Sequence, residues 1–179
     1  TSPGKTAKTG DLCSQWRGYN ILQSLGSFGI NLGFGDKTVC EVCEEQKVDT
    51  YTFLSVVNLT INGYKEYDNA DRLSLPTLLH YLKASHAYYI DFQLPFIRKE
   101  LVEALDEKDN LARLILKLYD DYAHSITNHM KYEEKMVFPY VQALIDGNAS
   151  ANFDIETFSK HHAQVDIKLK ELKSIIIKY

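Results

Sequence analysis

The sequence predicts an all-α protein in which an antiparallel up-and-down bundle of long helices follows a small helical domain. Apolar residues recur at alternating steps of three and four over three long stretches within residues 74–179. This is the period of a helix that buries one face. Short polar segments separate the stretches, and long helices joined by short loops are typical of an up-and-down bundle.

The composition is that of an ordinary protein with a hydrophobic core. Of the 179 residues, 45% are hydrophobic and 25% are charged, and the formal net charge is −4. Lysines and arginines are scattered, so we expect no nucleic-acid partner. No apolar run approaches the ~20 residues of a membrane-spanning helix, so we expect no membrane association. The three cysteines argue against a disulfide scaffold and favour a cytoplasmic location.

The chain is expected to have four parts. Residues 1–10 are polar and predicted to be a disordered tail, residues 11–61 a small N-terminal helical domain, residues 62–73 a linker, and residues 74–179 the bundle. Because the sequence starts without Met and ends inside a helical pattern, we expect a fragment or a processed form.

The small domain is predicted to contain three short helices. The first runs through residues 11–28 and ends in glycines. The second begins at Thr38, whose spacing to Glu41 matches a capping box. The third follows Asp49, which can cap its first turn.

Each of the three bundle helices has a suitable starting residue. Their expected bounds are Ser74 to about Asp106, Asn110 to near Gly147, and Asn152 or Asp154 to the end of the sequence. Pro95 and Pro139 lie inside the first and second helices, where kinks rather than breaks are expected.

Four polar residues fall on the stripes that these helices should bury. They are His86, His129, Glu133 and His162. Counted from the connecting loops at the helical rise, the first two lie at one level and the last two within about one turn of each other. The remaining histidines fall off the stripes and are expected to be solvated: His80, His124 and His161.

A bound cation would satisfy all four groups. Buried carboxylates and imidazoles are costly without partners. Imidazole nitrogen and carboxylate oxygen suit iron, manganese or zinc, and the spacing of His129 and Glu133 lets both reach one ion from one helix. The alternative is a layer of hydrogen-bonded polar side chains without metal. The meeting of four groups at one level favours the metal site.

At this point the sequence resembles a known family. The segment "HMKYEEKMVFP" resembles the His-Met-x-x-Glu-Glu-x-x-Leu-Phe-Pro helix of hemerythrin-like (HHE) domains. "LLHYLKASHAYYIDFQLPFI" and "SKHHAQVDIKLKELK" are similar to the first and third helices of the di-iron proteins associated with iron–sulfur cluster repair. "FGINLGFGDKTVCEVCEEQKVDTYTFLSVV" is similar to the short domain that precedes the bundle in those proteins.

The resemblance implies a non-haem di-iron centre with bridging carboxylates. Such a centre would bind or sense dioxygen or nitric oxide, or serve cluster repair under nitrosative stress, so that the protein is a metal-binding stress-response protein rather than a conventional enzyme. By motif match the implied metal ligands include His129 and Glu133. His162 keeps the family's spacing to later apolar positions, whereas His86 lies one residue farther from Pro95 than is usual.

Two departures from the family stand out. The adjacent cysteines of the N-terminal domain are replaced within "NLGFGD", which removes any chemistry based on that thiol pair. Only three of the four long bundle helices are present. A continuation past Tyr179, or a second copy in a homodimer, would complete the bundle. In the chain alone the iron site would be empty or hold a single ion, with Asp166 as a substitute carboxylate one turn after His162.

Two other functions compete with iron binding. One is a helical interaction or regulatory module with a vestigial metal site. The other is thiol redox chemistry at Cys40 and Cys43, which form a C-x-x-C on a predicted helix. A single pair is a weak signal, and two partly buried thiols are favoured over a redox site.

Overall fold

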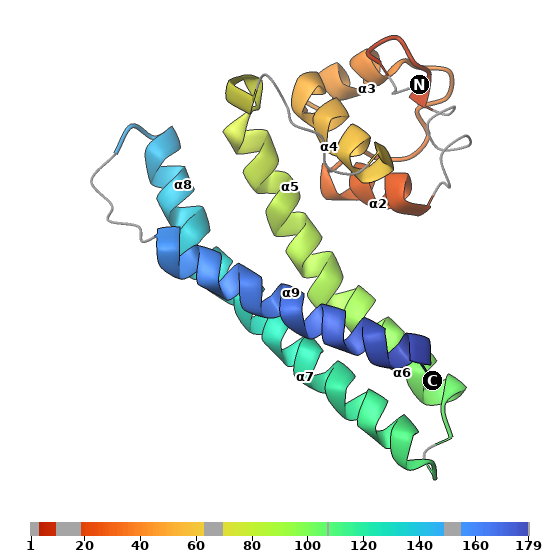
Figure 1. Ribbon diagram of the computed structural model, residues 1–179. Helices are drawn as coiled ribbons and strands as arrows, with labels where there is room; N and C mark the ends of the chain where they lie inside the picture. The colour runs from red at the N-terminus through yellow and green to blue at the C-terminus, as the bar shows by residue number, and fades with distance from the viewer. Residues whose placement is uncertain (1–3, 10–18, 63–69, 107, 149–154, 179) are drawn as a thin grey trace. The chain divides into compact units, whose positions relative to one another are not determined.

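The computed structural model describes residues 4–9, 19–62, 70–106, 108–148 and 155–178 (Figure 1). Within these ranges the regular structure is helical, apart from an isolated β-bridge between Lys8 and Thr38, which confirms the predicted all-α class. None of the helices in this part of the chain is long and apolar enough to span a membrane. The chain divides into two compact units, Thr1–Ser85 and His86–Tyr179.

The first unit is a small helical domain. Its elements are α2 (Tyr19–Ser27), α3 (Val39–Glu45), α4 (Thr50–Asn62), a 3₁₀ turn (Ala70–Arg72) and the part of α5 (Leu75–Tyr88) that precedes His86. Their apolar faces form one core, made of Ile21, Leu25, Phe28, Ile30, Val39, Val42, Cys43, Phe53, Leu54 and Val57. The helix that was predicted over residues 11–28 is seen from Tyr19 onward, and residues 10–18 lie outside the described ranges.

Two predicted helix starts of this unit, at Thr38 and Asp49, are confirmed. Thr38 and Glu41 form the reciprocal capping box of α3. The Asp49 carboxylate accepts hydrogen bonds from the backbone N–H of Thr52 at 2.8 Å and from its hydroxyl at 2.7 Å. The same hydroxyl oxygen accepts from the backbone N–H of Ser74, so one cap fixes the start of α4 and the approach to α5.

The N-terminal segment, expected to be a disordered tail over residues 1–10, instead binds to this unit over residues 5–9. Val39 N–H donates to the carbonyl of Ala7, and Thr9 N–H donates to the carbonyl of Lys37. Thr9 is only 1% exposed. These bonds satisfy backbone groups that precede and open α3, which explains why a polar segment is held here. The predicted division at residues 62–73 stays a prediction, because residues 63–69 lie outside the described ranges.

The second unit contains the long helices. It starts with the end of α5 and continues with a π-helical turn (Tyr89–Gln93), α6 (Leu94–Ala104), α7 (Asn110–Tyr132), a second π-helical turn (Glu133–Val137), α8 (Phe138–Ile145) and α9 (Ile155–Lys178). Helices α6 and α9 both pack against α7 (Figure 1). Their shared core is formed by Leu94, Tyr119, Tyr122 and Leu172.

The start of α7 differs from the prediction by one residue. The cap is Asp109, whose carboxylate accepts from the backbone N–H of Leu111 at 2.9 Å, and not Asn110, which is the first helical residue. Both residue types cap well, so the local conformation decides between them. The caps predicted for α9, Asn152 or Asp154, lie outside the described residues.

Both prolines are accommodated by a widened turn rather than a break. Pro95 and Pro139 are the second residues of α6 and α8, and each follows a π-helical turn. Leu94 N–H and Phe138 N–H each bond to the carbonyl five residues back. Proline has no N–H and its ring crowds the carbonyl four residues earlier, so the extra residue relieves the clash.

The helical period places a row of apolar residues on one face of each long helix, and these faces are buried only in part. Leu79, Ile115, Tyr122 and Leu172 are buried, as is His129. Other members of the same rows are exposed, contrary to prediction: Leu75, Phe96, Leu111, Met136, Leu144 and Ile176. Helical period fixes which residues share a face, but only packing decides how much of that face is covered.

Candidate metal centre

Two helical segments bring three of the four predicted ligands together. His86 lies in the last turn of α5, His129 lies in the last turn of α7, and Glu133 opens the π turn that follows α7. His162 lies on α9, and its side chain is outside the described residues. The loop between α6 and α7 reverses the chain, so residues 43 positions apart (129 minus 86) meet at one level.

Glu133 lies between the two imidazoles. Its Oε2 is 3.1 Å from Nε2 of His86, and its Oε1 is 3.3 Å from Nε2 of His129. The side chains of His86, His129 and Glu133 are 7%, 6% and 13% exposed. A carboxylate this buried is stabilised by N–H groups that donate to each of its oxygens. We define these three residues as the His–Glu–His cluster.

His86 is held on further sides. Its Nδ1 lies 3.2 Å from Oε1 of Glu134, which is 45% exposed. Its ring stacks on Phe138, with centroids 5.1 Å apart and planes inclined by 29°. Phe138 is itself buried. The imidazole therefore has a fixed plane and a carboxylate at each ring nitrogen.

The donor chemistry of the cluster fits a cation, although the described residues do not form a finished site. Within the described ranges, no three His, Cys, Asp or Glu side chains are arranged to hold a metal ion. The imidazoles instead contact Glu133 directly, one at each oxygen. Two imidazole nitrogens and a carboxylate are nonetheless donor types that iron, manganese and zinc accept.

The shared core of α6, α7 and α9 contains two buried tyrosines, Tyr119 and Tyr122. The Tyr119 hydroxyl donates to the carbonyl of Leu94 at 2.7 Å. Burial, and then the neighbouring Tyr89, raise the pKa of Tyr119 to about 12 and raise the pKa of Tyr122 as well. These phenols therefore stay protonated at neutral pH and add no charge to this core.

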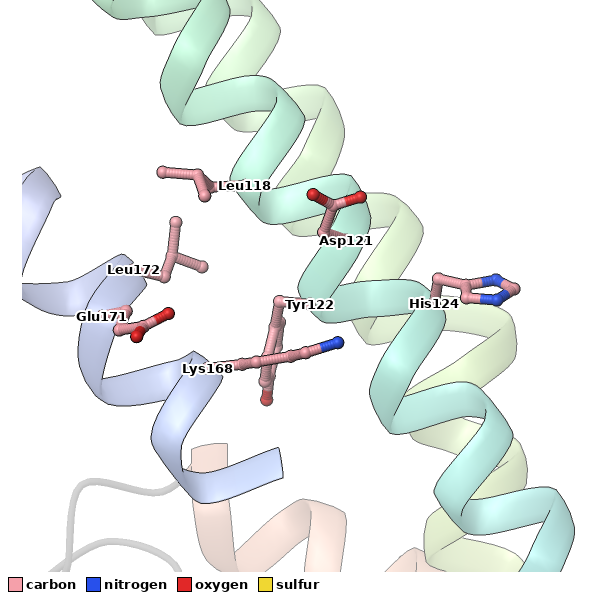
Figure 2. A pocket seen from close by; sticks show the side chains of 7 residues that line it. All are labelled: Leu118, Asp121, Tyr122, His124, Lys168, Glu171 and Leu172. Atoms are coloured by element: carbon pink, nitrogen blue, oxygen red, sulfur yellow. The ribbon is translucent and has the colours of Figure 1, made fainter. Parts of the chain in front are cut away.

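A separate cavity of about 210 Å³ lies between α7 and α9. Figure 2 shows Leu118 and Tyr122 from α7 with Leu172 from α9, and a rim of charged side chains that includes Lys168 and Glu171. None of the cluster residues lines this cavity. It is therefore a groove of the helix pair and not the metal centre.

The C-x-x-C has the properties of two structural thiols. Cys43 is fully buried in the first core, and burial raises the pKa of its thiol to about 11. The Cys40 thiol donates to Glu44 at 3.3 Å, and this contact raises its pKa above the ordinary value. Because the thiolate is the reactive form, both shifts weigh against thiol redox chemistry.

The histidines expected to be solvated behave so where they are described. His80 and His124 are exposed, and His124 contacts the side-chain amide of Asn128. The side chain of His161 lies outside the described residues. Sequence reasoning did not identify Glu134 as part of the site. The adjacent pair Glu133–Glu134 was the available signal, because neighbouring carboxylates can reach two sides of one partner.

Comparison with known proteins gives a family match over the part of the chain that contains the cluster. A protein-family model, described as the hemerythrin HHE cation-binding domain, matches residues 77–179 and thus includes the whole cluster. Protease 4 of Salmonella typhi is 34% identical over 95 residues, which cover 50% of this chain and 15% of that protein. The chain thus spans a small part of the length of that relative. No solved structure gives a significant match.

Proposed function

The chain belongs to the hemerythrin HHE cation-binding family, and on that premise we propose that it is a non-haem iron-binding protein. The proposed ligands are His86, His129, Glu133 and His162. The observation that carries the proposal is the His–Glu–His cluster, in which one buried carboxylate faces two imidazoles from different helical segments. Nitrogen and oxygen donors of this kind suit iron.

The two oxygens of Glu133 support a di-iron centre. Each oxygen faces a different histidine, at 3.1 and 3.3 Å, so the carboxylate and the two histidines would be available together to hold a paired centre. Bundle cores hold paired metals with inward-pointing carboxylates and histidines of this type. His162 is the proposed donor from α9.

Iron held by nitrogen and oxygen donors supplies open coordination positions suited to small diatomic molecules. The chain's own part is to orient the donors and exclude water. The stacked ring of Phe138 fixes His86, and the buried Tyr119 and Tyr122 fill part of the core shared by α6, α7 and α9. We propose binding or sensing of dioxygen or nitric oxide, or iron–sulfur cluster repair, in a stress-response protein of the cytoplasm rather than a conventional enzyme. The free thiols of Cys40 and Cys43 support a reducing compartment.

A second candidate is an interaction module whose metal site is vestigial. Exposed apolar side chains on the second unit support it, as does the direct pairing of the cluster residues with one another. A homodimer that closes the bundle would cover those side chains and is compatible with either function. Light scattering of the purified protein tests the dimer. The match to Protease 4 covers too little of that protein for proteolysis to be carried over.

Elemental analysis after aerobic and anaerobic purification tests iron binding. We expect iron in the wild type and loss of iron in His129→Ala. His124→Ala is the matched control, because this histidine lies on the same helix and is exposed. If the wild type takes up no iron or other transition metal, even when iron(II) is added anaerobically, the iron-binding proposal is wrong. The interaction module would then be the proposed function.

A further inference from the structure

The imidazole of His86 lies between two neighbouring carboxylates that have different surroundings. Nε2 faces Glu133 in the buried cluster, at 3.1 Å, and Nδ1 faces Glu134 at the rim, at 3.2 Å. The ring stacked on Phe138 cannot exchange these two edges without leaving its contact. The nitrogen that can join the other donors is therefore Nε2.

A neutral imidazole has one N–H and one lone pair, so its two nitrogens cannot both donate or both bind a metal. An ionised carboxylate only accepts hydrogen bonds. When the Nε2 lone pair binds a metal ion, the ring proton is on Nδ1, where the Glu134 carboxylate can accept it. In metal sites such a partner also fixes the ring orientation and raises the basicity of the ligand.

We infer that Glu134 is a positioning residue that accepts the Nδ1–H of His86 and thereby presents the Nε2 lone pair to the metal centre. This inference rests on the proposed function. Glu134 does not act as a ligand itself, because it contacts the edge of the ring that faces away from Glu133 and His129.

The widened turn explains how two successive residues reach one ring. In an α-helix neighbouring side chains diverge by about 100°. Glu133 and Glu134 open the π turn, where the hydrogen bond spans five residues and each residue advances by a smaller angle. The π turn thus has a role beyond relieving Pro139: it lets one helix place carboxylates at both nitrogens of His86.

Nitrogen-15 NMR of the zinc(II)-loaded protein tests the hydrogen bond between His86 and Glu134 directly. The Nδ1–H of His86 is expected to be protected from exchange with water in the wild type and to exchange faster in Glu134→Ala. Glu134→Gln is expected to restore protection, because its amide oxygen still accepts. Exchange that is equally fast in the wild type and in Glu134→Ala would overturn the inference.

Zinc(II) titration against a chromophoric chelator tests the consequence for binding. Partners that orient a metal-bound histidine typically contribute 10–100-fold in affinity, and water competes at the half-exposed Glu134, so we expect about a tenfold loss in Glu134→Ala. The zinc(II) affinity of Glu134→Gln should lie between that of Glu134→Ala and that of the wild type. Glu100→Ala, which removes an exposed carboxylate of α6, should match the wild type.

The two experiments separate the possible failures. If the wild type binds zinc(II) and Glu134→Ala binds it equally well, the inference is wrong and the proposed function stands. If the wild type binds neither zinc(II) nor iron(II), the proposed function fails, and this inference fails with it. Circular dichroism melting of each variant checks that the helices are intact.

Discussion

Replacing Glu133 by glutamine separates the two roles of this carboxylate. In the metal-free protein it accepts from His86 and His129, and in the proposed centre it binds iron. Glutamine has the same shape. Its amide oxygen can accept from one imidazole while its amide N–H donates to the other, so the metal-free contacts have a neutral substitute. The negative charge and the second acceptor oxygen of Glu133 have no substitute in glutamine.

The expected magnitudes differ accordingly. Hydrogen bonds to charged groups contribute about 1.5–3 kcal/mol and neutral ones about 0.5–1.5 kcal/mol. Neutralising two contacts should therefore lower the free energy of unfolding by about 2 kcal/mol. Residues that only orient a ligand contribute 10–100-fold to metal affinity. A direct ligand should contribute more than an orienting residue. We therefore expect Glu133→Gln to lower the metal affinity by at least ~100-fold, or about 2.7 kcal/mol of binding free energy.

Urea unfolding of the metal-free protein and anaerobic iron(II) binding in competition with a chelator measure the two quantities. Glu100→Gln removes one exposed charge on α6 and is the matched control for both. Iron(II) affinity in Glu133→Gln equal to that of the wild type would refute the assignment of Glu133 as a ligand. If the metal-free variant were globally unfolded, the view that the glutamine amide can replace the hydrogen bonds of the Glu133 carboxylate would be wrong.

Three further outcomes are expected. In the native protein Cys43 should alkylate far more slowly than Cys40 at pH 8, as read by mass spectrometry, because Cys43 is buried and its pKa is raised to about 11; equal rates would contradict this. The pKa of Tyr119 is raised from 10.0 to about 12 in the folded protein. The free energy of unfolding should therefore keep its full value below pH 10 and decline as the pH rises toward 12. Unfolding by urea at several alkaline pH values should show a weaker decline in Tyr119→Phe. Asp49→Ala should lower the free energy of unfolding by about 2 kcal/mol, because it removes a helix cap and leaves the buried hydroxyl of Thr52 without its acceptor; a thermal melt unchanged from the wild type would contradict it.

Local chemistry made much of the fold predictable. The capping box at Thr38 and the cap at Asp49 depend on residues three positions apart, so they could be identified without knowledge of the rest of the chain. The start of α7 was misplaced by one residue because Asp109 and Asn110 are both good caps. The exposed members of the predicted stripes were missed because burial depends on a covering helix, which periodicity does not specify.

The cluster shows the same division. The spacing of His86, His129 and Glu133 was enough to place them on inward faces at one level, because the helical period and rise are fixed by backbone geometry. It could not reveal that each oxygen of Glu133 meets a different imidazole, or that Glu134 reaches Nδ1 of His86. These contacts depend on how far the chain rotates within one π turn and on the tilt of one ring against Phe138. Such adjustments of a few ångströms arise from packing between helices, and the spacing of residues along one helix does not record them.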